Sequence, residues 1–292
     1  MGISISLLRL FPSHISDILK NVTSTCGFKV EEVRIKLGQA LIVRGCQTEF
    51  ICKEVIATRG DITHILMNAT NGAFHNAIDK IQNGYLPLGD GCRLGICGEG
   101  TLQNGVLYNL KNINALCLRV ARPIIGCADD VFSIISKDYL KNTIIIAPPG
   151  VGKTTLLREI IRKSSESGYY VGVVDEREEI SGMYMGVPTF DLGPRTDVIT
   201  GVSKEIAAPM LIRSMSPDLI TMDEITSVKD CPAIIEAYGK GVTLITTVHG
   251  ENRFDLYKPS ILPIMDLKIF HYAIYIEIRN NRRNYIVENL NE

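Results

Sequence analysis

The first part of the chain mixes two hydrophobic periodicities. Residues 1–20 space their apolar positions as an amphipathic helix does, with Ser13 or Ser16 as internal helix starts. Between Val33 and Leu37 apolar residues alternate with charged ones, and a Gly-Gln turn leads into a second apolar run at 41–43. That order predicts a β-hairpin. Helical and strand patterns in one segment indicate an α+β domain.

Two more helices and three short strands are expected before the pattern changes near residue 123. Asp61 can cap a helix whose apolar positions run from Ile62 to Ala69. A further helix is expected after Asn71-Gly72, with apolar positions at 74, 77, 78 and 81, ending at 84. Short strands are expected at 94–96, 106–110 and 116–120.

After residue 123 strand patterns alternate with helical ones, which is typical of a parallel sheet. Strands are expected at 143–146, 170–174, 219–222 and 242–247, and helices at 155–164, 204–215 and 231–238. The predicted fold class is therefore α/β, with an N-terminal α+β domain at 1–125 and a domain with a mostly parallel sheet at 126–292.

Composition supports two ordinary globular domains. The chain has 292 residues, 46% hydrophobic and 22% charged, with a formal net charge of −1, so no nucleic-acid partner is expected from charge. No apolar run approaches the ~18–20 residues that a bilayer span needs. Eight scattered cysteines without a C-x-x-C pair, and no signal peptide at the start, favour free thiols and a cytoplasmic protein.

The most informative segment begins with the β-branched run at 144–146 and continues through a Gly/Pro loop into an amphipathic helix. This is the strand, loop and helix order of a P-loop, although Ala147 stands where the usual first glycine would be. Glycines let backbone N–H groups wrap a phosphate at the helix N-terminus. The expected ATP-binding (Walker A) residues are Pro149, Gly150, Val151, Gly152, Lys153, Thr154 and Thr155.

Asp223 and Glu224 follow the apolar stretch at 219–222 and complete the expected nucleotide site as its Walker B element. At the carboxyl end of a parallel strand, Asp223 would share Mg²⁺ with the Thr154 hydroxyl, and Glu224 would polarise the attacking water. Lys153 would reach the β- and γ-phosphates and stabilise the charge that develops there.

Each of the other candidate residues admits a functional and a structural interpretation. His249 ends the next apolar strand and could orient water or relay the nucleotide state, or be structural. The acidic run from Asp175 to Glu179 could face the nucleotide or be a solvated charged turn. Arg195 and Arg213 could act as arginine fingers, worth ~10³–10⁵ in rate, or pair with local carboxylates.

Together these motifs resemble the stage III sporulation AA family of endospore-forming bacteria, relatives of the secretion and traffic ATPases of type II and type IV systems. The Arg-Ser-Met-Ser-Pro stretch that precedes the Asp-Glu pair is the most specific element. The chain departs from the family pattern at Cys92, at Ala147 and at 200–203. The motifs that carry the resemblance lie at 31–38, 91–95, 118–122, 174–180, 193–197, 213–224 and 246–250.

The resemblance implies a RecA-like P-loop domain in a homo-oligomeric ring, a hexamer, with ATP bound between neighbouring subunits. Glu179 would then belong to an acidic box and His249 to a histidine box, both catalytic. The implied partners are membrane-embedded sporulation channel proteins between mother cell and forespore, which the ATPase would energise from the mother-cell cytoplasm.

Two other functions remain open from the sequence. A nucleic-acid-binding P-loop ATPase would need a basic module, and the late cluster Arg279, Arg282 and Arg283 is most simply a solvated turn. A nucleotide-gated scaffold with little turnover is the other alternative, against which the intact Lys153 and Glu224 argue.

Overall fold

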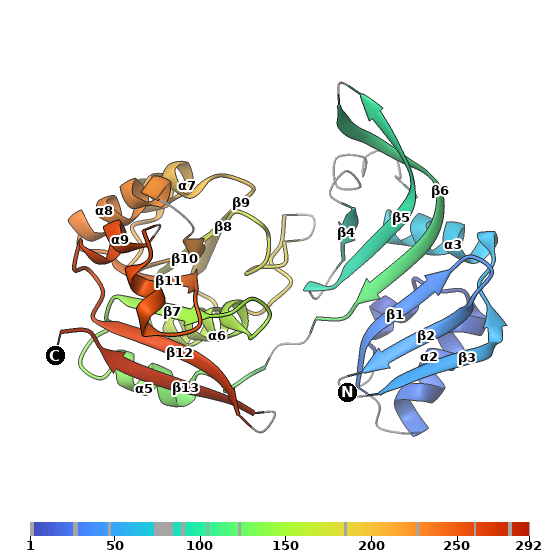
Figure 1. The fold of residues 1–292 in the computed structure, drawn as a ribbon, viewed down its shortest axis with the longest axis horizontal. Coiled ribbons are helices and arrows are strands. Elements are labelled where there is room, and N and C mark those ends of the chain that lie inside the picture. The colour runs from blue at the N-terminus through green and yellow to red at the C-terminus, as the bar shows by residue number, and fades with distance from the viewer. Residues whose placement is uncertain are drawn as a thin grey trace. The chain divides into compact units, whose positions relative to one another are not determined.

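The computed structural model describes residues 3–25, 29–45, 48–72, 84–88, 91–103, 105–121, 124–183, 186–225, 228–259, 261–279 and 282–291. Contacts divide the chain into two compact units, Met1–Arg122 and Pro123–Glu292 (Figure 1). The boundary expected from the sequence is at 125/126. Each unit has its own sheet and its own apolar core.

The N-terminal unit is an antiparallel sheet packed against helices. Its six strands lie in the order β3-β2-β1-β6-β5-β4. Apolar side chains of the sheet and of the two longer helices, such as Ile35, Leu118, Ile15 and Ile65, share one core. The strands are β1 (Val30–Lys36), β2 (Ala40–Gly45), β3 (Glu49–Ile56), β4 (Tyr85–Pro87), β5 (Arg93–Gln103) and β6 (Val106–Arg119). Among its described residues the helices are α1 (Ile5–Leu8), α2 (Ser13–Thr25) and α3 (Arg59–Ala69).

Several expectations for this unit need correction. The single helix over 1–20 is wrong, because α1 ends before Pro12, which disfavours helical backbone in the preceding residue. The internal start at Ser13 is confirmed, since α2 begins there. Asp61 is not the cap of α3; Thr58 is, in a capping box with Asp61. The strands expected at 106–110 and 116–120 are one strand, β6, because its polar middle still pairs with β5. The helix expected at 74–84 falls mostly outside the described residues.

The C-terminal unit is built on a seven-stranded sheet with the order β13-β12-β7-β11-β10-β8-β9. Six of these strands are parallel and β13 is antiparallel to β12. The predicted α/β class is confirmed. The strands are β7 (Thr143–Ala147), β8 (Val171–Asp175), β9 (Thr196–Thr200), β10 (Leu219–Ile225), β11 (Thr243–His249), β12 (Tyr272–Arg279) and β13 (Arg282–Asn289).

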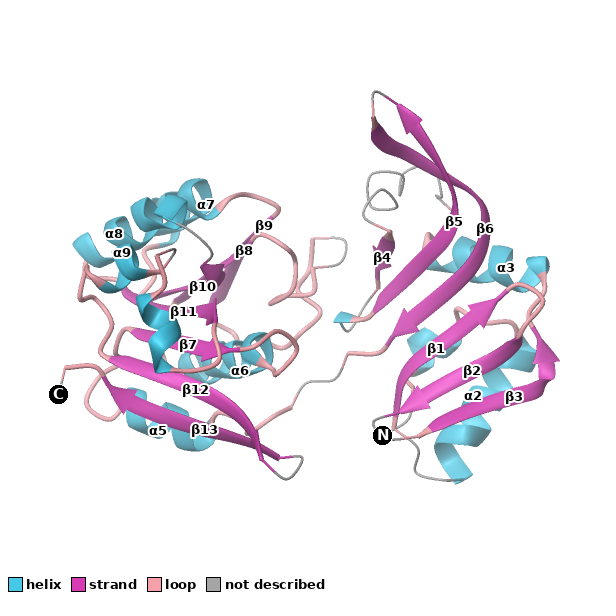
Figure 2. Ribbon diagram, viewed as in Figure 1, coloured by secondary structure: helices cyan, strands magenta, loops and turns pink. Residues whose placement is uncertain are grey.

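Helices cover both faces of this sheet (Figure 2). β7 and β8 are buried at every position, which explains why they read as continuous apolar runs rather than as alternating ones. Apolar residues of α7 and α8 pack on one face, and α6 lies on the other. The α-helices are α5 (Asp129–Ile135), α6 (Lys153–Glu166), α7 (Lys204–Met215), α8 (Cys231–Gly239) and α9 (Leu262–Met265), and the 3-10 helices are η3 (Val228–Asp230) and η4 (Arg253–Tyr257).

Among the described residues, no helix combines the length and the hydrophobicity that crossing a bilayer requires.

Candidate functional site

The predicted P-loop joins β7 to α6 at the carboxyl edge of the parallel sheet. Gly150 and Gly152 have φ values of +76° and +118°, in the left-handed region that side chains disfavour. Gly152 is the N-cap of α6, so the helix begins at Lys153 with its first backbone N–H groups facing the loop. The backbone conformation is the one that an anion-binding loop at a helix N-terminus requires.

Lys153 is buried, with only 7% of its surface exposed, and its ammonium has three partners. Nζ donates to the carbonyl oxygens of Ala147 (2.6 Å) and Pro148 (3.0 Å), and it lies 2.7 Å from Nδ1 of His249. Burial lowers the pKa of Lys153, while the carboxylates of Asp223 and Glu224 act in the opposite direction. Because an ammonium only donates, Nδ1 of His249 accepts and the imidazole is assigned as the neutral Nε2–H tautomer.

The Thr154 hydroxyl and the Asp223 carboxylate meet as expected. Thr154 Oγ1 donates to Asp223 Oδ2 at 2.9 Å, and the Thr247 hydroxyl of β11 donates to the other carboxylate oxygen. A hydroxyl and a carboxylate are oxygen donors of the kind that Mg²⁺ prefers. The donor chemistry therefore fits the metal that the sequence implied.

Glu224 occupies an irregular position within β10. Its φ is +49°, and the register between β10 and β11 shifts between Met222 and Ile225. Its backbone N–H donates to Thr247 Oγ1 (2.8 Å), and its two carboxylate oxygens contact His249 Nε2 (2.8 Å) and Arg177 Nη1 (2.7 Å). Side chains from four segments thus form one chain of contacts, Arg177–Glu224–His249–Lys153, which we call the relay chain.

Asp175, the first residue of the acidic run at 175–179, is not a solvated charge. It is 1% exposed and ends the buried strand β8. Its carboxylate accepts hydrogen bonds from the backbone N–H groups of Glu179 (2.8 Å), Ile180 (3.0 Å) and Ser181 (2.7 Å), and from the Ser181 hydroxyl (2.6 Å). Asp175 therefore shapes the turn that carries the rest of the acidic box.

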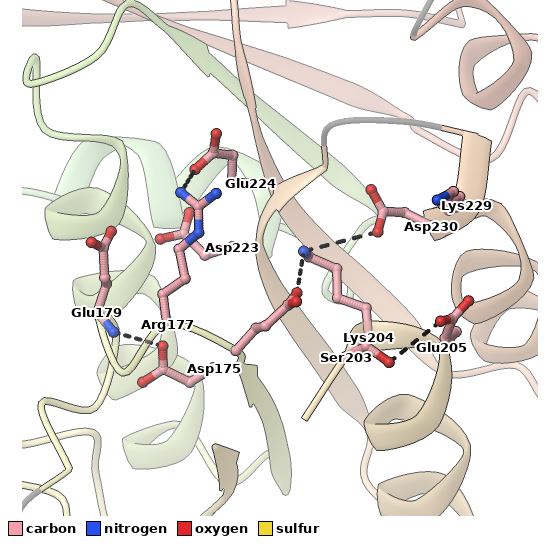
Figure 3. A pocket seen from close by; sticks show the side chains of 11 residues that line it. Asp175, Arg177, Glu179, Ser203, Lys204, Glu205, Asp223, Glu224, Lys229 and Asp230 are labelled. Atoms are coloured by element: carbon pink, nitrogen blue, oxygen red, sulfur yellow. Dashed lines mark hydrogen bonds and ion pairs between the residues drawn. The ribbon is translucent and has the colours of Figure 1, made fainter. Parts of the chain in front are cut away.

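A pocket of about 240 Å³ opens between this turn, the end of β10, the start of α7 and η3 (Figure 3). Seven carboxylates and three cations line it, among them Glu179 and Glu224, and Lys204 bridges Glu176 (3.0 Å) and Asp230 (3.9 Å). The excess of carboxylates gives the pocket a negative lining. The lining residues are Asp175, Glu176, Arg177, Glu179, Ser203, Lys204, Glu205, Asp223, Glu224, Lys229 and Asp230.

The two candidate arginine fingers lie away from the P-loop of their own chain. Arg195 precedes β9, and its Nη1 donates to the Ser165 carbonyl at 3.0 Å near the end of α6. Arg213 is in the last turn of α7, where Nε donates to the Pro209 carbonyl at 3.2 Å. Both side chains are exposed near the amino ends of the strands, the edge opposite the P-loop.

Two arginines with contacts near the site were not among the sequence-derived candidates. Arg158 of α6 donates to the carbonyls of Glu179 and Ile180 (both 2.8 Å) and stacks on the Phe190 ring at 3.6 Å. Burial lowers its pKa to about 10. Arg283, expected in a solvated turn, donates from Nε to the carbonyl of Val151 in the P-loop at 2.7 Å. No local pattern signals either contact, because each partner is distant along the chain.

The C-terminal unit defines the class of protein: a P-loop domain with the RecA-like fold of secretion ATPases. The structure is similar in fold to the ATPase DotB of Legionella pneumophila, with a TM-score of 0.61 and 17% identity, covering 96% of this chain and 81% of that one. It is also similar to the pilus retraction motor PilT with bound ADP, with a TM-score of 0.60 and 15% identity, covering 94% and 82%.

The chain belongs to the sporulation stage III, protein AA family, whose sequence model matches residues 4–285. It is 31% identical to stage III sporulation protein AA of Bacillus subtilis (strain 168) over 271 residues, which are 90% of this chain and 88% of that protein. The resemblance that the motifs indicated is confirmed.

Proposed function

We propose that this protein is a Mg²⁺-dependent ATPase that converts hydrolysis into conformational work on a membrane-bound sporulation channel. One observation supports the proposal above all. Two separate sets of contacts, Thr154–Asp223 and the relay chain through Lys153 and Glu224, join the P-loop to β10 and β11. Fold similarity to ATPases is consistent with this chemistry.

The residues present fit ATP and Mg²⁺. Backbone N–H groups from Gly150 to Thr155 would surround the phosphates, and Lys153 would turn from the loop carbonyls toward the β- and γ-phosphates. Thr154 and Asp223 would hold the metal. When bound with the nucleotide, Mg²⁺ supplies positive charge to the phosphate oxygens.

Glu224 would orient water and accept its proton. Each of its carboxylate oxygens accepts a bond here, one from His249 and one from Arg177, so these two contacts fix the carboxylate, and loss of either would free it to turn toward a water. His249 connects this carboxylate to Lys153, so a Lys153 that turns toward phosphate leaves Nδ1 of His249 without its donor. The relay chain would thus link phosphate occupancy to the freedom of the general base.

We further propose that the protein works as a homo-oligomeric ring, a hexamer, on membrane-embedded channel proteins at the mother-cell side of the forespore. Arg195 and Arg213 lie exposed on the edge opposite the P-loop, which is compatible with a role toward a neighbouring subunit's nucleotide. Glu179, in the pocket beside Glu224, is proposed to act on the same nucleotide.

The proposal is tested by phosphate release from Mg²⁺-ATP at several protein concentrations, with Lys153→Ala and Glu224→Gln in parallel. Specific activity is expected to rise with concentration and both substitutions to abolish it. Glu251→Gln, an exposed glutamate two residues beyond His249, is the matched control and should keep wild-type activity. Equal phosphate release from wild type and both variants would refute ATPase function, and binding without release would favour the scaffold alternative.

A further inference from the structure

The β12–β13 hairpin brings Arg283 against the P-loop of the same chain. Nε of Arg283 donates to the Val151 carbonyl at 2.7 Å. A Cβ placed on Gly152 would lie 2.9 Å from that same nitrogen, so a side chain at position 152 would displace the guanidinium. Glycine at 152 therefore serves both the left-handed backbone and the close approach of Arg283.

The sheet order tells which end of a nucleotide would meet this arginine. The P-loop follows β7, and Asp223 and Glu224 come from β10, two strands away across β11. A triphosphate would direct its metal-bound γ-end toward those carboxylates. β12 adjoins β7 on the other side and is parallel to it, so the end of β12 and the start of β13 lie at the same carboxyl edge (Figure 1). The nucleoside end would therefore leave the P-loop toward Arg283.

The Arg283 side chain has the chemistry to receive that end. Among the described residues its hydrogen bond to the P-loop uses Nε alone, whereas a guanidinium carries five N–H donors. A planar cation of this kind binds phosphate oxygens and stacks on aromatic bases. Arg283 is exposed and shares its face of β13 with the half-buried Tyr285, while Arg282 points to the opposite face.

We propose that Arg283 is a nucleotide-binding residue that contacts the nucleoside monophosphate portion of the nucleotide held on the P-loop of its own chain. Its Nε bond to the Val151 carbonyl places the guanidinium beside the loop and leaves its other N–H groups to bind the nucleotide. The inference rests on the proposed nucleotide site, but it requires binding only and not hydrolysis.

The test measures binding of ATP, ADP and inorganic tripolyphosphate, each with Mg²⁺, by calorimetry on the full chain. Arg283→Ala is expected to weaken ATP and ADP binding about tenfold, the usual loss for a charged hydrogen bond, and to leave tripolyphosphate within about twofold of wild type. Arg282→Ala is the matched control, with the same charge removed one residue away on the other face, and should leave all three ligands unchanged. Arg283→Gln, which keeps a planar donor without the charge, should fall between.

Three results would overturn the inference. Equal weakening of ATP and tripolyphosphate by Arg283→Ala would make Arg283 a residue that only shapes the loop. Unchanged affinity for all three ligands would show that Arg283 is a solvated residue that does not contact the nucleotide. Equal losses of affinity from Arg283→Ala and Arg282→Ala would show that only the local positive charge matters, and not a contact of Arg283. Failure of the proposed nucleotide site is distinguishable, because wild type would then bind no ligand better than Lys153→Ala does.

Discussion

Two acidic segments belong to hydrogen-bonded neighbours of one parallel sheet, β8 and β10, yet their carboxylates have different kinds of partner. Asp175 is held by the turn that follows it, mainly through backbone N–H groups. Asp223 and Glu224 are held by side chains from the P-loop, from β11 and from the acidic turn. A carboxylate fixed by backbone amides is committed to structure, whereas one held by side chains can exchange its partners.

The largest expected effect is on catalysis, from Glu224→Gln. If this carboxylate is the general base, turnover falls by about 10²–10⁴. The free energy of unfolding changes by less than about 1 kcal/mol, because Arg177 and His249 are exposed enough for water to replace the acceptor that the amide removes. Single-turnover phosphate release and urea unfolding measure the two quantities. A variant that loses stability but keeps turnover would reverse the proposed roles of the two segments.

Asp175→Ala should show the opposite profile. Removing a buried carboxylate leaves three backbone N–H groups and one hydroxyl without their acceptor, which costs about 3 kcal/mol of unfolding free energy. Urea unfolding checks the loss. Asp175→Asn keeps one acceptor oxygen and should lose less unfolding free energy. A loss for Asp175→Ala within about 0.5 kcal/mol of wild type, as for a typical surface substitution, would contradict the structural role of Asp175.

The acidic turn has a second support in Arg158, which holds the carbonyls of Glu179 and Ile180 while stacking on Phe190. Arg158→Met keeps the apolar stem and removes the donors, so we expect a loss of about 2 kcal/mol and faster proteolysis within the turn. Arg158→Lys has a single ammonium in place of the forked guanidinium, so it should retain only part of the wild-type stability. Unchanged proteolysis in the methionine variant would show that Asp175 alone maintains the turn.

The smallest effect concerns the charge that each segment presents to Lys153. Burial lowers the pKa of this lysine, and Glu224 opposes that shift, so Glu224→Gln should lower the pKa further below 10.5. Asp175→Asn should leave it unchanged. Between the folded pKa and 10.5 the unfolded chain binds more protons, so stability rises with pH in that window, and the window widens in Glu224→Gln. NMR titration of ¹³C-labelled lysine side chains measures the shift, and equal effects of both substitutions would remove the distinction.

Local sequence sufficed for elements whose determinants are contiguous. The helix expected at 204–215 has those bounds, and the strand, Gly/Pro loop and helix order at 144–157 is present, with left-handed backbone at the two loop glycines 150 and 152. The α/β class followed from the alternation of apolar strands and amphipathic helices, since that alternation reflects burial directly.

Partners that are distant along the chain could not be predicted in this way. Arg283 meets Val151 across 132 residues, so its position depends on where β12 joins the sheet. The sequence does not distinguish Asp175 from the charged residues that follow it. Only the fold around β8 buries Asp175 and leaves Glu176 and Arg177 exposed. Strand β6 looked like two strands because polar residues exposed on an antiparallel sheet interrupt the apolar run without ending the strand.

The left-handed backbone of Glu224 carries a consequence for how this chain can be improved by mutation. In a regular strand, neighbouring side chains project to opposite faces of the sheet, so Asp223 and Glu224 could not both point into one site. The bulge in β10 interrupts this alternation, and it places Glu224, a non-glycine residue, at φ +49°. Glycine at 224 would relax the backbone while deleting the carboxylate. Selection for thermal robustness alone would therefore favour loss of the residue proposed to do the chemistry.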